Sequence, residues 1–523
     1  MMNLIMKHYR ISEIKTEIDE PIDVLPAKVA RKCGLKTGDI LRWEIRRKSI
    51  DSRHKPDIKW VYTVDFWCEK KVRVADPVKA EVANEPVCGE TELIGRPVVI
   101  GMGPCGIFAA LELAKRGYKP LVLERGPAMS ERIEAVENFR KHHVLNPEAN
   151  MLYGEGGAGT FSDGKLGTGI KDGHIRDVLR AFADAGAGED ITYLAKPHIG
   201  TDVLRQTIVN LRNQIIELGG EVRFNCKLES FDIDKGELRS INVCNTVNGV
   251  NETIACNALI LAIGHSARDT FAELLSTGFK MEQKAFSIGV RMEHPQSLID
   301  LAQYGETAIE KYGHLLPAAD YKISATASNG RGVYSFCMCP GGEVVVCSTK
   351  DGELCVNGMS NRNRDSGTAN SGILCTVNTE DYNNGNESDI LAGVRYQEKY
   401  ERLAFENGGG DFTAPSASMG DFLSGRAPQI DNSLPDFAAS ALKDAVPIFA
   451  RKIRGYDDPN AIVTAVETRS SSPVRIIRGN DGESNIKGIY PAGEGAGYAG
   501  GITSAACDGI RAAQHLINKY AQP

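Results

Sequence analysis

Features that would place the protein at a membrane or on nucleic acid are missing from its sequence. No apolar run reaches the ~18 residues that a membrane-spanning helix needs. Residues 1–10 lack the long apolar core of a secretory signal. The net charge is −7, so the chain as a whole lacks the positive charge of a nucleic-acid or membrane-surface protein. We therefore expect a soluble, cytoplasmic protein.

Cysteine pairs with the spacing of a redox or zinc motif are also missing. The 13 cysteines are scattered, and none forms a C-x-x-C pair. This predicts neither a disulfide framework nor a metal site. Only Cys337 and Cys339 lie close together in the sequence.

The sequence is organised around residues 97–126. An apolar run at 98–100 is typical of a short buried strand, and Gly101, Gly103 and Gly106 follow it in G-x-G-x-x-G spacing. Such glycines permit a tight turn, the close approach of a pyrophosphate, and tight packing of helix on strand. The phosphate then meets the N-terminus of the helix, where unpaired N–H groups favour an anion.

A second apolar run, at 121–123, ends in Glu124, 23 positions after Gly101. In dinucleotide-binding units a carboxylate at this place accepts hydrogen bonds from the adenosine ribose. This context favours a nucleotide site over the alternative, a glycine turn in an ordinary βαβ unit.

The length of 523 residues predicts several domains. We expect a small basic domain, a linker, the first part of a nucleotide-binding domain, an inserted substrate domain, and the C-terminal part of the nucleotide-binding domain. Their expected ranges are 1–68, 69–95, 96–279, 280–425 and 426–523.

Residues 1–68 predict a β-α-β-β order, with a basic segment at 46–55 between the last two strands. That segment could grip RNA or a phosphorylated ligand. The more common alternative is a solvated loop, or a loop docked on the acidic body.

A second glycine-rich block spans residues 154–166. It has too many glycines for the interior of a helix or strand, and it ends in the polar residues Ser162, Asp163 and Lys165. We expect a loop folded over a cofactor, with backbone N–H groups directed at it. A long surface loop is the alternative.

Two strand ends further along the chain carry small residues. The apolar run 258–264 ends in Ala-x-Gly, which is typical of the carboxyl edge of an open α/β sheet, and His265 follows it. His265 is either near the cofactor or a hydrogen-bonded structural residue. Near the C-terminus a strand leads into Gly493, Glu494 and a loop that opens a helix near Ile502, whose positive end favours an anion or a flavin.

Residues 280–425 predict antiparallel strands, including 333–339 and 343–348 joined by a tight turn. Because side chains alternate along a strand, Cys337 and Cys339 are expected on one face. A redox-active or substrate-facing thiol is one interpretation; small apolar core residues are the other.

Together these blocks resemble the FAD-dependent oxidoreductases of the glutathione-reductase superfamily, second subgroup. Residues 154–166, 334–345 and 489–501 resemble, more narrowly, a bacterial family of FAD-dependent or NAD-utilising dehydrogenases, over nearly the whole chain. The resemblance implies an α/β fold with a three-layer, Rossmann-like FAD domain. It also implies that Glu124 contacts the adenosine ribose, the Leu228 backbone the adenine, and Glu494 the ribityl chain. The last position is usually Asp, so the longer Glu494 could shift this contact.

The full set of residues that we expect to bind FAD follows from the motifs and the resemblance. These residues are Gly101, Gly103, Pro104, Cys105, Gly106, Glu124, Arg125, Gly156, Gly157, Gly159, Thr160, Phe161, Ser162, Lys165, Leu228, Gly264, Gly493, Glu494, Gly501 and Ile502.

A bound flavin would carry the hydride or electrons, and the protein would orient it. Because no second G-x-G-x-x-G lies between a strand and a helix, either NAD(P)H visits the substrate pocket transiently or a small organic substrate reduces the flavin directly. Weak candidates for acid, base or thiol roles are Lys165, His265, Cys337 and Cys339. Two rivals remain: an RNA-binding or RNA-modifying flavoprotein that uses residues 46–55, and a flavin-bound protein without turnover.

Overall fold

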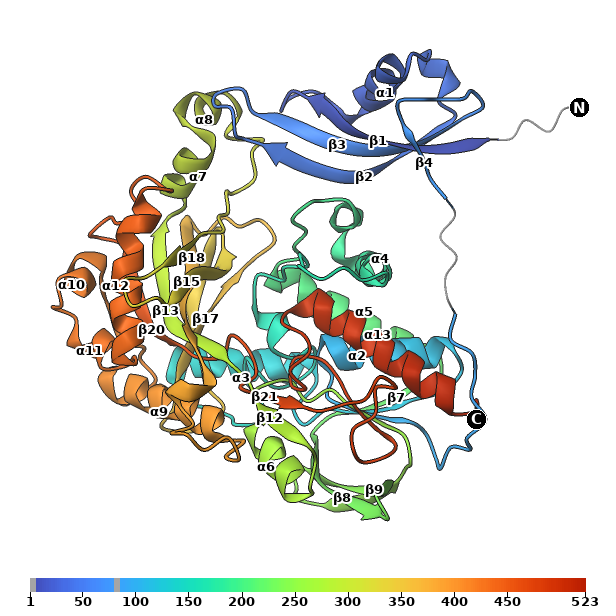
Figure 1. The fold of residues 1–523 in the computed structure, drawn as a ribbon, viewed down its shortest axis with the longest axis vertical. Helices are drawn as coiled ribbons and strands as arrows, with labels where there is room; N and C mark the ends of the chain where they lie inside the picture. Colours follow the sequence, from blue (N-terminus) through green and yellow to red (C-terminus); the bar gives the residue numbers. More distant parts are fainter. Residues whose placement is uncertain (1–5, 80–84) are drawn as a thin grey trace, which may run out of the picture.

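The computed structural model describes residues 6–79 and 85–523 (Figure 1). Residues 1–5, and residues 80–84 within the expected linker, lie outside the described residues. A small N-terminal unit lies across the top of two larger parts, one built on a parallel sheet and one on an antiparallel sheet.

The N-terminal unit is a four-stranded sheet with one covering helix, in the strand order β2-β3-β1-β4. Leu25 and Val29 of the helix are fully buried and pack with Val64 and Phe66 of the sheet. The expected β-α-β-β order is confirmed. The fourth strand comes from the expected linker and pairs Pro77 with Tyr9. The elements are β1 (Lys7–Thr16), α1 (Leu25–Cys33), β2 (Arg42–Asp51), β3 (Lys59–Cys68) and β4 (Asp76–Pro77).

The second part has three layers, as expected. Five short parallel strands run in the order β22-β11-β5-β6-β7. Helices α2, α5 and α13 pack in one hydrophobic cluster on one face, and the antiparallel β8, β9 and β10 bury the other face. The strands are β5 (Val98–Ile100), β6 (Leu121–Leu123), β7 (Glu221–Arg223), β8 (Cys226–Asp234), β9 (Glu237–Asn245), β10 (Asn251–Ala255), β11 (Leu259–Leu261) and β22 (Ile489–Pro491). The helices are α2 (Pro104–Lys115), α3 (Met129–His142), α4 (Ile175–Phe182), α5 (Thr201–Glu217), α6 (Arg268–Ser276) and α13 (Ile502–Lys519).

The third part is a six-stranded sheet in the order β14-β15-β18-β13-β20-β19, covered by helices. It extends beyond the boundary expected at residue 425, because β20 pairs with β13 from Ile462 to Glu467. Its strands are β13 (Phe286–Pro295), β14 (Ser324–Thr326), β15 (Gly332–Cys339), β18 (Thr368–Val377), β19 (Ser416–Ser418) and β20 (Ile462–Glu467). Its helices are α7 (Gln296–Tyr304), α8 (Glu306–Tyr312), α9 (Ala392–Asn407), α10 (Met419–Leu423), α11 (Pro428–Asp431) and α12 (Asp436–Ala450).

The turn at residues 340–342 does not make the hairpin that its sequence suggests. β15 pairs with β14 and β18, whereas β16 (Gly342–Cys347) turns away and pairs with β17 (Cys355–Ser360) in a separate ribbon. The expectation that both strands belong to one sheet is therefore wrong, because β18, distant in sequence, takes the edge of β15. A second ribbon joins β12 (Met281–Gln283) to β21 (Val474–Ile476).

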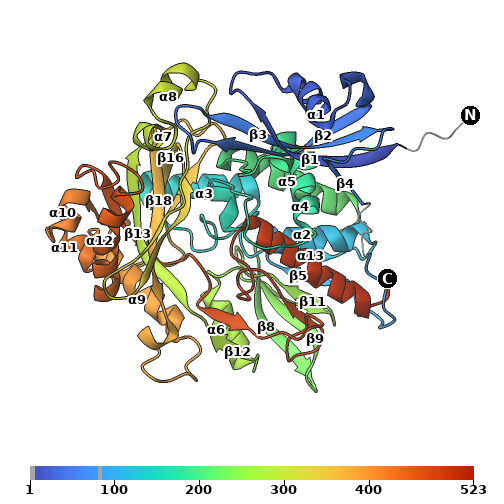
Figure 2. The same cartoon turned by 45° about the horizontal axis from the view of Figure 1, so that its top comes forward.

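The basic segment 46–55 is docked on the body of the protein, but the expectation that it forms a loop is wrong for residues 46–51, which continue β2 and pair with β3. The backbone N–H of Lys48 donates to Tyr193 O at 2.7 Å, and its carbonyl accepts from Ala195 N–H at 2.9 Å. Within the N-terminal unit, the Lys48 ammonium lies 4.1 Å from the centre of the Trp60 ring on β3. Lys55 donates to the carbonyl of Ala302, and Figure 2 shows this end of the hairpin beside α7 and α8. The segment thus connects the N-terminal unit to both larger parts.

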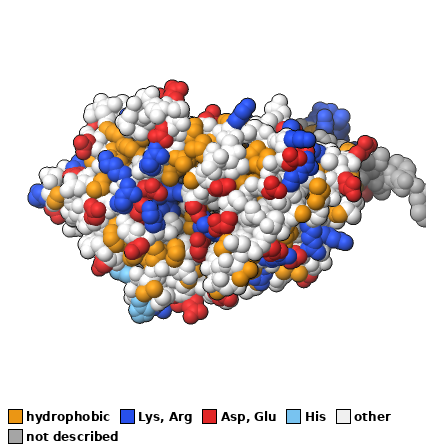
Figure 3. Space-filling view, turned by 90° about the horizontal axis from the view of Figure 1, so that it is seen from below, with side chains coloured by type: hydrophobic (Ala, Val, Ile, Leu, Met, Phe, Trp, Pro, Cys, Tyr) orange, Lys and Arg blue, Asp and Glu red, His pale blue; other side chains and the backbone are white. Residues whose placement is uncertain are grey.

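The surface charge is mixed. On the face shown in Figure 3, acidic and basic side chains are interspersed. Among residues 6–79 and 85–523, no helix combines the length and apolar character that crossing a bilayer requires.

Candidate functional site

The glycine motif forms a turn from β5 into α2. Gly101 adopts φ +96°, which L-residues with a side chain rarely adopt, and a Cβ there would overlap the backbone of Ala262, directly after the neighbouring strand β11. Gly103 caps α2, and no side chain supplies a capping hydrogen bond. The first N–H groups of this helix are therefore available to an anion.

Glu124, at the end of β6, is 5% exposed and anchors this turn. Its carboxylate accepts hydrogen bonds from the backbone N–H groups of Met102 at 2.8 Å, Gly126 at 2.9 Å and Gly154 at 3.1 Å. A carboxylate has about four acceptor positions, so about one is left for a ribose hydroxyl.

The second glycine block lies against the first. It contains a short 3-10 helix at Ala158–Phe161. A Cβ on Gly157 would lie 2.9 Å from the Cα of Gly103, and one on Gly159 would lie 3.1 Å from a side-chain carbon of Ile502. The three segments expected to bind FAD are thus brought together: residues 101–106, 156–162 and 493–502.

Arg132 of α3 organises this block, although nothing in the charged helical pattern around it indicated that role. Its side chain is fully buried, and it donates to the carbonyls of Asn150 at 3.0 Å and Glu155 at 2.6 Å. Its guanidinium also lies 4.8 Å from the centre of the Phe161 ring. Burial lowers the pKa of Arg132 to about 9.

The C-terminal segment is fixed by a residue that was also missed. Asp508, fully buried on α13, accepts the Gly493 N–H at 2.8 Å and a two-point ion pair from Arg478 at 2.8 and 2.9 Å. Gly501 caps α13 without a side-chain capping bond. Because Asp508 holds Gly493, the next residue, Glu494, projects from a fixed position.

The residues around these segments fit a flavin dinucleotide. Two helix N-termini, those of α2 and α13, have no side-chain cap. A Cβ on Gly264, Gly500 or Gly501 would meet no atom within 4 Å, so space is open beside these backbones. The buried Nε2 of His265 has no hydrogen-bond partner among the described residues.

The remaining expected FAD ligands have other partners. Ser162 donates to Gly159 O at 2.6 Å, and Leu228 is buried in β8 opposite Val243. Arg125 pairs with Glu148 at 2.7 Å and with Asp269 at 2.9 Å. The guanidinium of Arg125 is therefore already held by carboxylates, and a role in binding FAD stays a prediction.

The glycine block also touches the antiparallel sheet. Asp163 is 3% exposed and pairs with Arg364 at 2.6 Å, and Lys165 Nζ lies 3.8 Å from the same carboxylate. Asp163 also accepts a hydrogen bond from the hydroxyl of Ser360 at the end of β17. Asp163 and Lys165 therefore lie where the glycine block meets the antiparallel part of the structure.

Cys337 and Cys339 do not share one environment, which corrects the expectation from strand alternation. A bulge interrupts β15 between Phe336 and Cys339, and Cys337 adopts φ +40°. Cys337 is exposed, whereas Cys339 is 1% exposed. Protein atoms nevertheless crowd the Cys337 thiol, and this desolvation raises its pKa to about 12 against the opposing effect of Lys165.

A buried polar cluster holds this bulge. Arg291, fully buried on β13, donates to the carbonyl of Cys337 at 2.9 Å. It also pairs with Glu467 of β20 at 2.7 Å and donates to Asn370 of β18 at 3.1 Å. The cluster joins three strands that are far apart in the sequence, so no local pattern could have indicated it.

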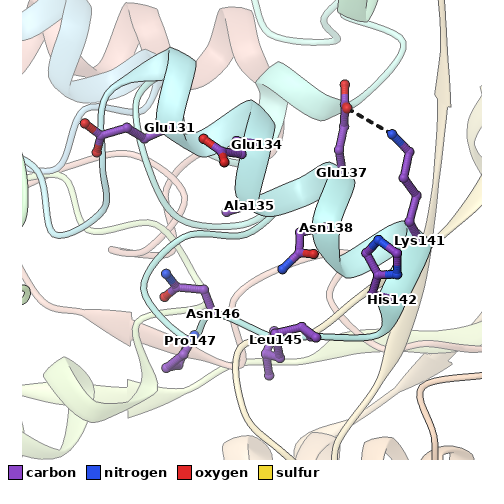
Figure 4. Close-up of a pocket in the computed structure, with 11 residues that line it drawn as sticks. Glu131, Glu134, Ala135, Glu137, Asn138, Lys141, His142, Leu145, Asn146 and Pro147 are labelled. Carbon is purple, nitrogen blue, oxygen red and sulfur yellow. Dashed lines mark hydrogen bonds and ion pairs between the residues drawn. The ribbon is translucent and has the colours of Figure 1, made fainter.

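A surface hollow of about 740 Å³ lies elsewhere. It is on the outer side of α3 and its following loop, lined by Glu131, Glu134 and Glu137 among others (Figure 4). None of the residues expected to bind FAD or substrate lines it. Within the described ranges, no group of three or more His, Cys, Asp or Glu side chains is arranged to hold a metal ion.

Comparison with known proteins agrees with this geometry. Residues 95–287 match the pyridine nucleotide-disulphide oxidoreductase family, residues 285–470 match the C-terminal domain of FAD-dependent proteins, and residues 8–67 match a domain of unknown function. An uncharacterized protein of Clostridium beijerinckii is 44% identical over 98% of this chain and 99% of its own length.

Solved structures are more distant. The flavin-dependent brominase Bmp2, as a triple mutant, is 12% identical over 80% of this chain and 79% of its own, with a TM-score of 0.37. The E. coli quinol fumarate reductase FrdA, in a mutant form, is 12% identical over 81% and 69%, with a TM-score of 0.35. From the family matches, together with the converging glycine segments, we conclude that the chain belongs to the FAD-dependent oxidoreductase family.

Proposed function

We propose that the protein oxidises or reduces a small molecule at the junction between the glycine block and the substrate sheet, using FAD, with NAD(P)H as a transient reductant. The observation that carries this proposal is the contact of buried Asp163, from the glycine block, with Arg364 at 2.6 Å and with Ser360 of β17. FAD, when bound, supplies the hydride or electron transfer. The chain supplies binding, orientation and the control of protons.

Two side chains at this junction have different chemical roles in the proposal. The side chain of Lys165 is 31% exposed and its ammonium lies 3.8 Å from Asp163, so it can orient an anionic or carbonyl group of the substrate and donate a proton to it. Desolvation raises the pKa of Cys337 to about 12, which keeps this thiol protonated at neutral pH. Cys337 is therefore a weak donor and a wall of the pocket rather than a nucleophile.

The chain folds so that this junction is stable. Arg291, anchored by Glu467, holds the carbonyl of Cys337 and thereby the bulge. Arg364 holds Asp163 from the other side. A rigid junction supports productive orientation of two reactants, which accounts for much of enzymatic rate enhancement.

The test is an anaerobic titration of the FAD-loaded protein with NADH and with NADPH, followed by flavin absorbance. Bleaching by either nucleotide supports a reductase or dehydrogenase. If neither nicotinamide nucleotide reduces the flavin but a candidate organic substrate does, the electron donor is that substrate and not NAD(P)H. Failure of the purified protein to bind FAD at all would contradict the proposal.

We do not propose RNA binding. The segment 46–55 that could have contacted RNA uses Lys48 and Lys55 to dock on the rest of the protein, and Arg53 pairs with Asp51 at 2.8 Å.

A further inference from the structure

Two adjacent polar side chains in the loop after β11 each have a buried atom that lacks a hydrogen-bond partner among the described residues. His265 is 8% exposed and Ser266 is 6% exposed. The Nε2 of His265 and the Oγ of Ser266 have no hydrogen-bond partner among the described residues. Buried polar atoms in native proteins are nearly always bonded, so two neighbouring exceptions at the ligand-binding edge of a parallel sheet point to a bound group.

The neighbouring strand presents Glu494 to the same histidine. β11 and β22 pair in parallel, with Leu261 opposite Pro491, so the loops that follow them begin side by side. Glu494 Oε2 lies 3.6 Å from His265 Nδ1. A Cβ on Gly495 would overlap the backbone of Gly264, so the backbones of the two loops are in direct contact.

The spacing of these groups selects the chemistry of the ligand. With the Nδ1 proton directed at the Glu494 carboxylate, the neutral imidazole has Nε2 as a hydrogen-bond acceptor. An acceptor at Nε2 requires a donor such as a hydroxyl, whereas a phosphate oxygen would require a donor there. Ser266 adds a group that both donates and accepts. The pair therefore suits a polyhydroxyl chain.

Open space adjoins the backbone at this place. A Cβ on Gly264, directly before His265, would meet no atom within 4 Å, and the same holds for Gly500 and Gly501 at the start of α13. The Glu494 carboxylate lies nearer to His265, at 3.6 Å, than a water-separated pair would, so it can position the imidazole.

We propose that His265 is the direct contact of the ribityl hydroxyls of FAD, with Ser266 beside it, and that Glu494 acts behind His265 as a positioning residue. The extra methylene of Glu494, compared with the usual Asp, would place its carboxylate on the imidazole and pass the ribityl contact to the histidine. This inference rests on the proposed use of FAD but not on any substrate or turnover.

The test is a double-mutant cycle on FAD affinity. Apoprotein of the full chain is titrated with FAD, and binding is followed by flavin fluorescence. We expect His265→Ala to weaken FAD binding about tenfold or more. Glu494→Ala should weaken FAD binding when His265 is present, but should have no further effect when His265 is already replaced by Ala. If the two effects multiply in the double variant, Glu494 contacts FAD independently and the proposal is wrong.

A second measurement separates ligand binding from a structural role. His265→Leu removes an unsatisfied buried atom, so the apoprotein should melt at the same or a higher temperature while FAD binding weakens. A lower melting temperature with unchanged FAD affinity would show that His265 is structural, and would overturn the proposal.

A matched control is His8→Ala in the N-terminal unit. His8 also pairs with a carboxylate, Asp65, at 3.2 Å, but it is far from the glycine segments in the fold. It should leave FAD affinity unchanged. If the wild-type protein binds no FAD, the proposed function fails. If it binds FAD and the His265 variants bind FAD as tightly as the wild type, this inference alone fails.

Discussion

The flavin-binding segments and the substrate sheet are built on different principles. Around the glycine segments, recognition depends on backbone: helix N-termini without caps, glycines at positions such as Gly101 and Gly157, and N–H groups bound by Glu124. In and beside the antiparallel sheet, the structure depends on buried charges, such as Arg291 with Glu467 and Glu401 with two arginines. Backbone geometry can be set by a short local segment, whereas buried ion pairs need side chains assembled from several segments of the chain.

The sharpest test of the charge-based region is Glu401→Ala. Glu401 of α9 is fully buried and pairs with Arg268 of α6 and with Arg469, each at 2.8 Å. Removing it leaves two cations without their partner, which should cost about 3–5 kcal/mol. Urea denaturation measures the loss. Unfolding at the wild-type midpoint would show that the buried pairs are not needed.

The same residue predicts a pH dependence. Burial alone would raise the pKa of Glu401, but Arg268 and Arg469 lower it well below its usual range. A group whose folded-state pKa is lowered stabilises the protein above its unfolded pKa, about 4.3 for Glu, and this stability is lost as the pH falls below that value. We expect Glu401→Gln to flatten the decline in the free energy of unfolding between about pH 5 and pH 3.

Lys165→Met tests whether the junction between the two regions carries the chemistry. We expect the rate of flavin reduction to fall about a hundredfold, because one oriented cation is lost at the reacting group. FAD affinity is measured by the same fluorescence titration. An unchanged affinity assigns Lys165 to the substrate, whereas weaker binding would assign it to FAD, as the sequence motif also predicts. Cys337→Ala is the matched control, because its protonated thiol contributes little. If Cys337→Ala lowers the rate of flavin reduction more than Lys165→Met does, the proton-donating role belongs to Cys337 and not to Lys165.

Gly157→Ala tests the backbone-based region. The residue has φ +64°, and a Cβ would lie 2.9 Å from the Cα of Gly103. The strain should cost about 1–3 kcal/mol and should displace the glycine block, so FAD affinity falls as well. Gly167→Ala is the control, because a Cβ there meets no atom within 4 Å. Equal FAD affinity in the two variants would show that the block does not shape the site.

The smallest expected effect concerns the strand that docks the N-terminal unit. Lys48→Ala removes a cation from the face of Trp60 on the neighbouring strand β3, a contact worth about 0.5–1 kcal/mol, while the backbone bonds to Tyr193 and Ala195 remain. We expect slightly faster hydrogen exchange at the Ala195 amide, because β2, whose Lys48 carbonyl accepts this N–H, is held less firmly against β3. Arg47→Ala, on the same strand with its side chain exposed, should not change it. No change with Lys48→Ala would mean that the backbone bonds alone hold the unit.

Local sequence alone was sufficient for the features that depend on backbone geometry. The β-α-β-β order of the N-terminal unit, the glycine turn after β5 and the strand before Glu494 all follow from short patterns, because φ angles and apolar alternation are set by neighbouring residues. The three-layer fold follows from the order of these patterns and from the family resemblance.

Tertiary structure decided the features that join distant segments. β18 took the edge of β15 that the turn at 340–342 had suggested for β16, and a bulge separated Cys337 from Cys339. Arg132, Asp508 and Arg291 acquired their roles from partners 15 to 176 residues away in the sequence. The physical reason is that a buried charge is stable only where the complete fold surrounds it with partners, and no single segment contains those partners.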